Sequence, residues 1–285
     1  MNLSQPPFAI IPRQSAAAAV DMVEVFAAID PLPDKVSQSF DAVAQCPSVN
    51  ESTPPLAAGR RLAQAIDRGE GTGRVNFYHN AQHFCEVLLC AHFLSLWTDL
   101  AADARLEIVL AALMHDFHHD GYPNGPIPFR LERQAIHQAT PFLLEAGIPE
   151  KQQRRLSALI LATEIVHGLP IVRACYTHHI ANAPLPALPV AAPEMTALAQ
   201  YSIATQQTLI LCEADVLPSV GLTIEHAICL QDKLSLESSV PLQKEDKLRF
   251  ISEIFPGFVI GVFFQPNVER LYQFLRSRPN DVSTS

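Results

Sequence analysis

The chain has 285 residues, of which 48% are hydrophobic, and a formal net charge of −9. That length and apolar content suffice for a large core, so we expect one large domain, alone or with a short leader. The negative charge, with no Lys- or Arg-rich stripe to offset it, excludes a nucleic acid polymer as a routine partner.

The start of the chain shows no secretory or membrane signal. Ser-Gln-Pro-Pro at 4–7 interrupts it, and the apolar run 16–29 carries Asp21 and Glu24. No stretch approaches the roughly 20 apolar residues that a membrane span needs. The six cysteines show no paired zinc spacing and fall mostly in apolar stretches, as reduced core residues do. We therefore expect a cytoplasmic protein with no membrane partner.

Helical signals follow one another along the chain. Pro54 and Pro55 begin a predicted helix that Gly69 ends, and residues 81–97 are apolar almost all round, which is typical of a buried helix. Further predicted helices are 102–117, 132–145, 150–166 and 195–217. No run alternates apolar and polar residues between hairpin turns, so the predicted fold class is all-α.

Three segments rich in Pro, Ser, Asn or Ala are predicted to be irregular: 1–15, 46–53 and 181–193. The last is too short and apolar for a flexible linker, so we place it on the surface of one domain. We divide the chain into a leader with helical and irregular segments at 1–53, a compact multi-helix domain at 54–278 and a disordered tail at 279–285. The leader could cap the domain or join two copies as a homodimer.

The densest group of metal-binding residue types is the segment 115–120, which reads His-Asp-Phe-His-His-Asp at the end of an apolar run. Imidazole nitrogens and carboxylate oxygens are the ligands that hold a hydrolytic zinc, manganese or iron. A charged, solvated helix end can contain the same residue types without binding a metal, so a metal site at this segment needs support from elsewhere in the chain.

Three other segments supply that support. His79 and His83 are four residues apart, so they share a helix face or a helix entry. Glu164 places a carboxylate in an otherwise apolar predicted helix, and Asp215 ends a long apolar segment before Pro218. The structural alternatives are a satisfied core histidine and an ordinary helix end before proline.

The order of these segments resembles the HD superfamily of metal-dependent phosphohydrolases, and more closely the catalytic domain of the class I cyclic nucleotide phosphodiesterases. Residues 78–83 read Tyr-His-Asn-x-x-His and residues 115–124 read His-Asp-x-x-His-x-Gly-x-x-Asn, as in that family. Leu-Glu at 131–132, Leu-Ala-Thr-Glu at 161–164 and Ala-Asp at 214–215 resemble its later motifs. The likeness runs from about residue 75 to about residue 275. It implies a compact helical domain with a two-metal site in its core.

The resemblance assigns metal-binding and acid roles. The implied metal ligands are His83, His115, Asp116 and Asp215. Asp116 would bridge a tightly bound zinc and a second, hydrated Mg²⁺ or Mn²⁺, with iron as an alternative. A hydroxide bridging the two metals would attack the phosphorus. His79 would be the general acid for the departing oxygen, because imidazole holds an available proton near physiological pH.

The same resemblance assigns supporting roles. His119 and Glu132 match groups that orient the attacking water, and Glu164, where the family has Asp, would hold metal-bound waters. Tyr78 and Asn124 complete the matched motifs and are assigned to substrate binding.

Substrate recognition departs from the family's pattern. Phe255 stands where a glutamine would hydrogen-bond the purine, and Phe258 matches the phenylalanine that stacks on the base. Pro218 replaces an assisting asparagine. Without these polar groups a pocket discriminates weakly between bases. We expect a small phosphodiester or nucleotide substrate, with a 3′,5′-cyclic nucleotide as the first candidate and slight discrimination between adenine and guanine.

The sequence leaves three other functions open. One is an HD phosphohydrolase that acts on another nucleotide or phosphate ester. Another is a diiron HD oxygenase, to which His137 or His167 would add ligands. The third is a non-catalytic signalling module, a class that usually loses the ligands this chain keeps. Residues that match no motif are expected to be solvated or locally bonded: His92, His118, Asp120, His178, His179 and His226.

Overall fold

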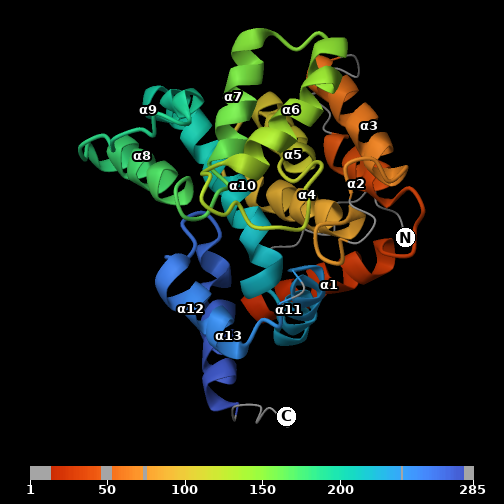
Figure 1. The fold of residues 1–285 in the computed structure, drawn as a ribbon, viewed down its shortest axis with the longest axis vertical. Coiled ribbons are helices and arrows are strands. Elements are labelled where there is room, and N and C mark those ends of the chain that lie inside the picture. The colour runs from red at the N-terminus through yellow and green to blue at the C-terminus, as the bar shows by residue number, and fades with distance from the viewer. Residues whose placement is uncertain (1–13, 46–52, 73–75, 239, 279–285) are drawn as a thin grey trace.

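The computed structural model describes residues 14–45, 53–72, 76–238 and 240–278 (Figure 1). Within these ranges the chain is built from helices and has no strand, only an isolated bridge between Thr72 and His119. The predicted all-α class is therefore confirmed. No single helix in the described ranges is long and apolar enough to cross a membrane. The helices Ser202–Val220 and Ile224–Ser238 reach that length and apolar content only when taken together, and they are bent by 98°.

The elements follow the chain in two groups. The first comprises α1 (Ser15–Ile29), α2 (Lys35–Ala44), α3 (Pro54–Asp67), α4 (Ala81–Ser95), α5 (Ala102–Met114), α6 (Arg130–Glu145) and α7 (Glu150–Leu161). The second comprises α8 (Leu169–Ala181), the 3-10 turn η1 (Pro193–Met195), α9 (Thr196–Gln200), α10 (Ser202–Val220), α11 (Ile224–Ser238), α12 (Lys244–Arg249), the π turn η2 (Phe250–Ile254), the 3-10 turn η3 (Val262–Phe264) and α13 (Gln265–Ser277).

Helix α10 is the centre of the assembly. It packs against α4, α5, α7, α8 and α11, and in Figure 1 it runs through the middle of the molecule, with α8 and α9 on one side and α4 on the other. Both α4 and α10 are buried over most of their length because apolar residues surround nearly their whole circumference. Polar side chains on such helices need a bonded partner or a ligand, since burying them alone is costly.

Helices α1 and α2 lie within the predicted leader, 1–53. Their Met22, Phe26 and Phe40 side chains are buried in the same core as α3 and α4. A Cβ added at Gly59 on α3 would lie 2.1 Å from the Phe40 ring, so the close approach of α2 and α3 requires glycine there. The described part of the leader thus packs on the main core. The boundary at 53/54 stays a prediction, and the predicted tail at 279–285 lies outside the described residues.

The predicted helix starts at 54, 81, 102 and 150 agree with the structure, but several ends do not. The predicted helix 102–117 ends at Met114. The predicted helix 150–166 ends at Leu161, so Glu164 lies in a turn. The predicted helix 195–217 is divided at Tyr201, whose extended backbone separates α9 from α10. Helix α10 then continues through Pro218, because packing on several sides retains a helix that lacks one amide donor.

Candidate metal centre and active site

His79 and His83 lie on either side of the start of α4. The Asn80 side chain caps this helix by accepting hydrogen bonds from the backbone N–H groups of Gln82 and His83, at 2.9 and 3.3 Å. His83 therefore belongs to the first turn of α4, whereas His79 precedes the cap on non-helical chain. The motif thus brings two histidines to one helix end.

Helix α5 ends where the second motif begins. His115 is its C-cap residue, and Asp116 follows it out of the helix. His118 then adopts a left-handed backbone, with φ 66°, and its N–H donates to the Gly71 carbonyl at 2.7 Å. This tight turn holds the motif against the segment that precedes α4.

Four side chains from α4, the end of α5 and α10 converge on one point. Their ligand atoms all lie within 4.8 Å of one another: His83, His115, Asp116 and Asp215. His83 Nε2 lies 3.2 Å from His115 Nε2 and 3.1 Å from Asp116 Oδ2. Asp215 Oδ1 lies 3.5 Å from His83 Nε2 and 3.6 Å from His115 Nε2. Ligands about 2.0–2.2 Å from one zinc are separated by roughly 3–3.6 Å, so this spacing fits a shared cation.

The hydrogen bonds of the two histidines also fit a cation. His115 Nδ1 donates to the Ala112 carbonyl at 2.8 Å, which leaves the Nε2 lone pair facing the cluster. His83 Nδ1 is buried and has no hydrogen-bond partner among the described residues. Lone pairs and carboxylates gathered this closely repel one another unless positive charge lies between them. The four predicted ligands therefore form a set that suits a divalent metal ion.

A second group of side chains adjoins the cluster and contains Glu237 from α11, which sequence analysis did not identify. Glu237 Oε1 accepts a hydrogen bond from His79 Nδ1, and Oε2 accepts from the backbone N–H groups of Tyr78 and His79 at 2.8 and 3.0 Å. His79 Nε2 lies 3.7 Å from Asp116 Oδ2. Glu237 thereby fixes the His79 tautomer and turns Nε2 toward the cluster.

The charges around His79 favour its protonated form. Burial lowers the pKa of His79, but the carboxylates of Asp116 and Glu237 outweigh this effect, so that the pKa is raised overall. A histidine in this state holds a proton that it can donate near neutral pH.

The signal for Glu237 lies in the spacing of 224–238. Leu230, Leu234 and Glu237 are separated by four and three residues, so they share one helix face. Leu230 and Leu234 line the pocket beside the cluster. Their shared face would have marked Glu237 as a candidate, although the sequence does not reveal that it meets His79.

His119 stacks on His79. Their ring centroids are 3.6 Å apart and the planes differ by 19°. The Gly121 N–H donates to His119 Nδ1 at 3.0 Å, which leaves the ring proton on Nε2. Burial lowers the pKa of His119 to about 4, so this ring is neutral near neutral pH. The surroundings thus favour the protonated form of His79 and the neutral form of His119.

Glu132 and Asn124, which are predicted to have different roles, are hydrogen-bonded to each other. Asn124 Nδ2 donates to Glu132 Oε2 at 3.0 Å, and Asn124 Oδ1 accepts from the Leu131 N–H at 2.8 Å. Burial raises the pKa of Glu132 to about 7. This carboxyl group can therefore gain or lose a proton at physiological pH.

The Glu164 side chain is hydrogen-bonded to the backbone of the turn that follows it. Its Oε2 accepts hydrogen bonds from the backbone N–H groups of His167 and Gly168, at the turn that leads into α8. The side chain is buried and lines the same pocket as the metal cluster. Its assignment to metal-bound waters stays a prediction.

One pocket of about 790 Å³ opens beside the cluster. The residues predicted for the site that line it are Tyr78, His79, Asp116, His119, Asn124, Glu132, Glu164 and Asp215. Helices α11 and α12 and the turn η2 supply further lining residues that sequence analysis did not single out, among them Gln231, Lys247 and Phe250. The pocket is therefore lined both by residues of the predicted site and by residues of α11, α12 and η2 that belong to none of the motifs.

The structure does not bring Phe255 and Phe258 to this pocket, in contrast to their predicted substrate-binding role. Both belong to the core, with 5% and 7% of their surface exposed, and their rings pack edge to face at 4.9 Å. Phe250 stacks on Phe255 at 6.2 Å and lines the pocket instead.

A buried glutamate holds the loop 255–261 in the path that buries Phe255 and Phe258. Glu213 lies on α10, two residues before Asp215, and its carboxylate accepts hydrogen bonds from the backbone N–H groups of Val259, Ile260 and Gly261, the last at 2.7 Å. These bonds tie the loop to α10, and Phe258 is buried beside it.

The remaining histidines lie outside the cluster formed by the described residues. His226 Nε2 pairs with Glu86 at 3.0 Å, and His179 Nε2 bonds to the Leu198 carbonyl at 2.8 Å, as expected for locally bonded residues. His137 and His167, the candidate extra ligands for two irons, are exposed and lie outside this cluster, although His167 lines the same pocket.

Comparison with known proteins identifies the fold. No protein-family model matches the chain, and no curated protein matches it. Two crystal structures of the phosphodiesterase domain of a rhodopsin–phosphodiesterase fusion protein, from the choanoflagellate Salpingoeca rosetta, are similar. One has a TM-score of 0.60 and 17% identity, covering 97% of this chain and 95% of that domain. The other has a TM-score of 0.59 and 15% identity, covering 97% and 92%. The chain therefore has the fold of a phosphodiesterase domain.

Proposed function

We propose that the protein is a metal-dependent phosphodiesterase that hydrolyses a small phosphodiester, with a 3′,5′-cyclic nucleotide as the first substrate to test. The observation that carries the proposal is the convergence of His83, His115, Asp116 and Asp215 beside a histidine paired with Glu237. The phosphodiesterase fold supports it.

The chain's own residues would divide the chemistry between them. Divalent ions held by the cluster, zinc at the tight site and Mg²⁺ or Mn²⁺ at the second, would supply an activated water and neutralise phosphate charge. Asp116 faces both the cluster and His79, so it would be the ligand that two ions share if both are bound. His79 Nε2 would donate its proton to the departing oxygen, while Glu237 keeps Nδ1 protonated.

The diiron oxygenase alternative has no added ligand in the clusters of the described residues. His137 and His167 lie outside these clusters, and of the two only His167 lines the pocket. A second ion in this protein would instead depend on Asp116 and on the carboxylates that line the pocket.

The decisive experiment combines metal analysis with a substrate panel. Purified protein is supplied with Mn²⁺, Mg²⁺ or Zn²⁺ and offered cyclic nucleotides, linear dinucleotides, mononucleotides and bis(p-nitrophenyl) phosphate, with products identified. We expect diester cleavage that a chelator abolishes. Cleavage of monoesters alone would overturn the proposal in favour of a different phosphohydrolase, and iron with oxygen uptake would favour an oxygenase.

A further inference from the structure

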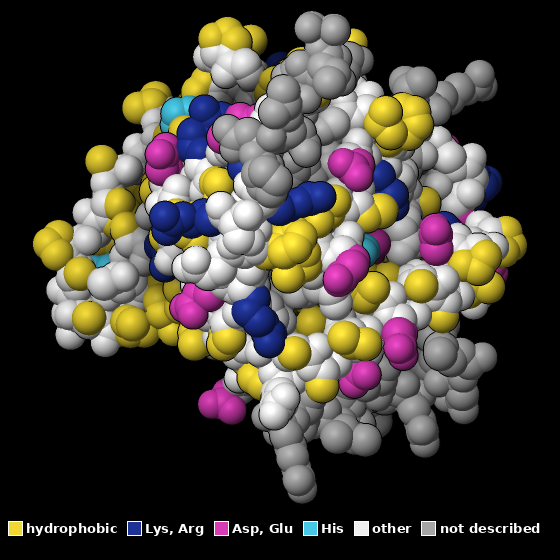
Figure 2. Space-filling view, turned by 90° about the horizontal axis from the view of Figure 1, so that it is seen from below, with side chains coloured by type: hydrophobic (Ala, Val, Ile, Leu, Met, Phe, Trp, Pro, Cys, Tyr) yellow, Lys and Arg dark blue, Asp and Glu magenta, His cyan; other side chains and the backbone are white. Residues whose placement is uncertain are grey.

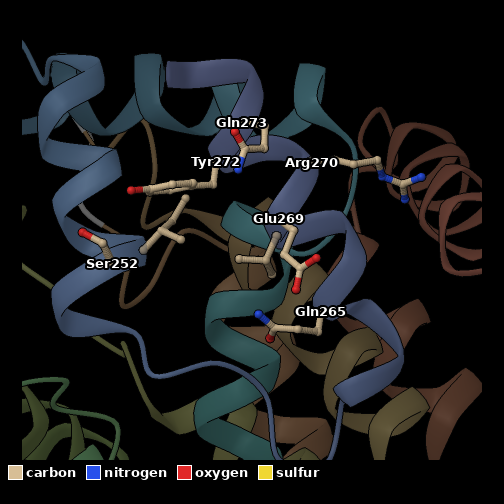
Figure 3. A pocket seen from close by; sticks show the side chains of 8 residues that line it. Ser252, Gln265, Glu269, Arg270, Tyr272 and Gln273 are labelled. Carbon is tan, nitrogen blue, oxygen red and sulfur yellow. The ribbon is translucent and has the colours of Figure 1, made fainter. Parts of the chain in front are cut away.

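The wall formed by α12 and η2 has two faces, each of which lines a different cavity. Ile251 and Ser252 face a cavity of about 610 Å³ between η2 and α13, where Figure 3 shows Ser252 across from Gln265 and Glu269. Lys247, Phe250 and Ile254 are spaced by three and four residues, so they share the other face, and all three line the candidate active-site pocket. A π turn such as η2 often marks a functional site in a helix.

Lys247 is the unusual residue on this wall. It is half-buried, and among the described residues its ammonium group has no ion pair with a carboxylate; its recorded contact is with the Phe250 ring, 5.9 Å from Nζ to the ring centroid. The neighbouring basic residues are paired: Lys244 Nζ donates to the Arg278 carbonyl at 2.5 Å, and Arg249 lies 3.2 Å from Asp246.

The charge and burial of Lys247 together indicate that it lacks an anionic partner. Burial alone lowers the pKa of Lys247 to about 8, with no carboxylate near enough to counter it. An ammonium group in such a place is stabilised when an anion binds to it. The Lys and Arg residues that line the pocket are Lys247 and Arg249, and of these Arg249 is ion-paired with Asp246.

The surroundings of Lys247 also offer apolar contact. Figure 2 shows the side of the molecule on which α12 and α13 lie, where Lys and Arg side chains (dark blue) lie next to exposed hydrophobic side chains (yellow). Within the pocket, Phe250, Ile254 and Leu234 provide apolar surface beside the ammonium group. A ligand with both a planar part and a negative charge would satisfy both kinds of contact.

We propose that Lys247 binds a second anionic group of the substrate, separate from the phosphodiester at the metal centre, and that the Phe250 ring packs against the part of the substrate between them. The inference rests on the proposed function, since it names a property of that site's substrate. The substrate class is therefore a phosphodiester that carries an additional negative charge, such as a dinucleotide with a terminal phosphate, in place of a simple 3′,5′-cyclic nucleotide, whose only charge is that of the phosphodiester.

A matched pair of substrates tests this proposal. Diadenosine monophosphate (ApA) and its 5′-phosphorylated form (pApA) contain the same phosphodiester and differ by one terminal phosphate. We expect kcat/KM for pApA to exceed that for ApA by about 10-fold to 100-fold, the usual effect of a hydrogen bond between charged groups. Lys247→Met should abolish this preference, so that the ratio of kcat/KM for pApA to kcat/KM for ApA falls to about 1. Lys247→Arg should retain most of it.

Lys244→Met is the control, because Lys244 lies on the same helix but does not line the pocket. It should keep the preference for pApA. Thermal unfolding of all three variants verifies that each is folded. A preference that Lys247→Met retains, or equal rates for the two substrates with wild-type protein, would overturn the Lys247 proposal and leave the phosphodiesterase proposal standing.

A binding measurement separates the two proposals when no hydrolysis occurs. The ligands are analogues of ApA and pApA in which a CH₂ group replaces the bridging ester oxygen, titrated calorimetrically into metal-loaded protein. Tighter binding of the phosphorylated analogue, lost in Lys247→Met and kept in Lys244→Met, supports the Lys247 site even if every diester resists cleavage. No difference between the analogues would overturn it.

Discussion

The bond between Glu237 and His79 provides a direct test of the proposed acid. In Glu237→Gln, the side-chain oxygen can still accept from a backbone N–H of Tyr78 or His79, but the NH₂ group cannot accept the His79 Nδ1 proton. A hydrogen bond to a charged group is worth about 1.5–3 kcal/mol, which corresponds to about 10-fold to 100-fold in rate when it orients the acid. We expect a loss of this size in kcat for a diester with a poor leaving group.

Leaving group and pH distinguish an acid from a purely structural residue. A p-nitrophenolate leaving group needs little protonation, so its release should slow by less than about threefold. The Glu237 carboxylate helps to raise the pKa of His79, and the protonated form is the active one. The rate is therefore retained below that pKa and lost as the pH rises through it. Removing the charge lowers the pKa, so the alkaline fall in kcat should move to lower pH.

The control is Glu225→Gln, which changes an exposed glutamate in the first turn of the same helix and should leave both rates unchanged. Equal losses in Glu237→Gln on good and poor leaving groups, with no displacement of the pH profile, would refute the assignment of His79 as the acid.

Three further predictions concern the ligands, the loop and a buried carboxyl group. Asp116→Ala should lose bound metal and diester cleavage but keep its helical circular dichroism, whereas Asp120→Asn, which alters a carboxylate paired with Arg130 instead, should keep both. Phe258→Ala should lower the free energy of unfolding by about 3–5 kcal/mol in denaturant titrations, as expected for a core phenylalanine; a selective rise in KM for nucleotides with unchanged stability would contradict this. In metal-free protein, burial raises the pKa of Glu132 from its ordinary value of 4.5 to about 7. The protonated carboxyl group therefore stabilises the fold below pH 4.5, and this contribution is lost as the pH rises through about 7. Glu132→Gln should thus reduce the decrease in the free energy of unfolding between pH 4.5 and about pH 7.

The sequence predicted which four side chains converge, because metal-ligand chemistry restricts residue type and spacing. His83 and Asp215 lie on α4 and α10, and His115 and Asp116 follow the end of α5, yet each lies in a short motif with a recognisable order. The all-α class followed from helical periodicity and the absence of strand patterns, both of which are local properties of the chain.

What the sequence did not predict depends on tertiary contacts. Glu237 meets His79 only because the end of α11 lies beside the segment that precedes α4, and no local pattern reports that contact. Phe258 matches a family residue and Phe255 replaces one, but the hydrogen bonds that Glu213 accepts from backbone N–H groups set the path of their loop. Helix ends were also misjudged. The turn after Leu161, with Glu164 bonded to backbone N–H groups, is decided by a side chain three residues beyond the helix.

The Asn80 cap has a consequence for protein engineering. It makes His83 part of a buried helix, while the segment that ends at His79 is held by Glu237 from a different element. Phe77, an exposed residue of this stretch, can therefore be varied, for example to accommodate bulkier leaving groups, while Tyr78, His79 and the helix that carries a metal ligand stay unchanged. Metal affinity and leaving-group scope should be independently adjustable in this scaffold.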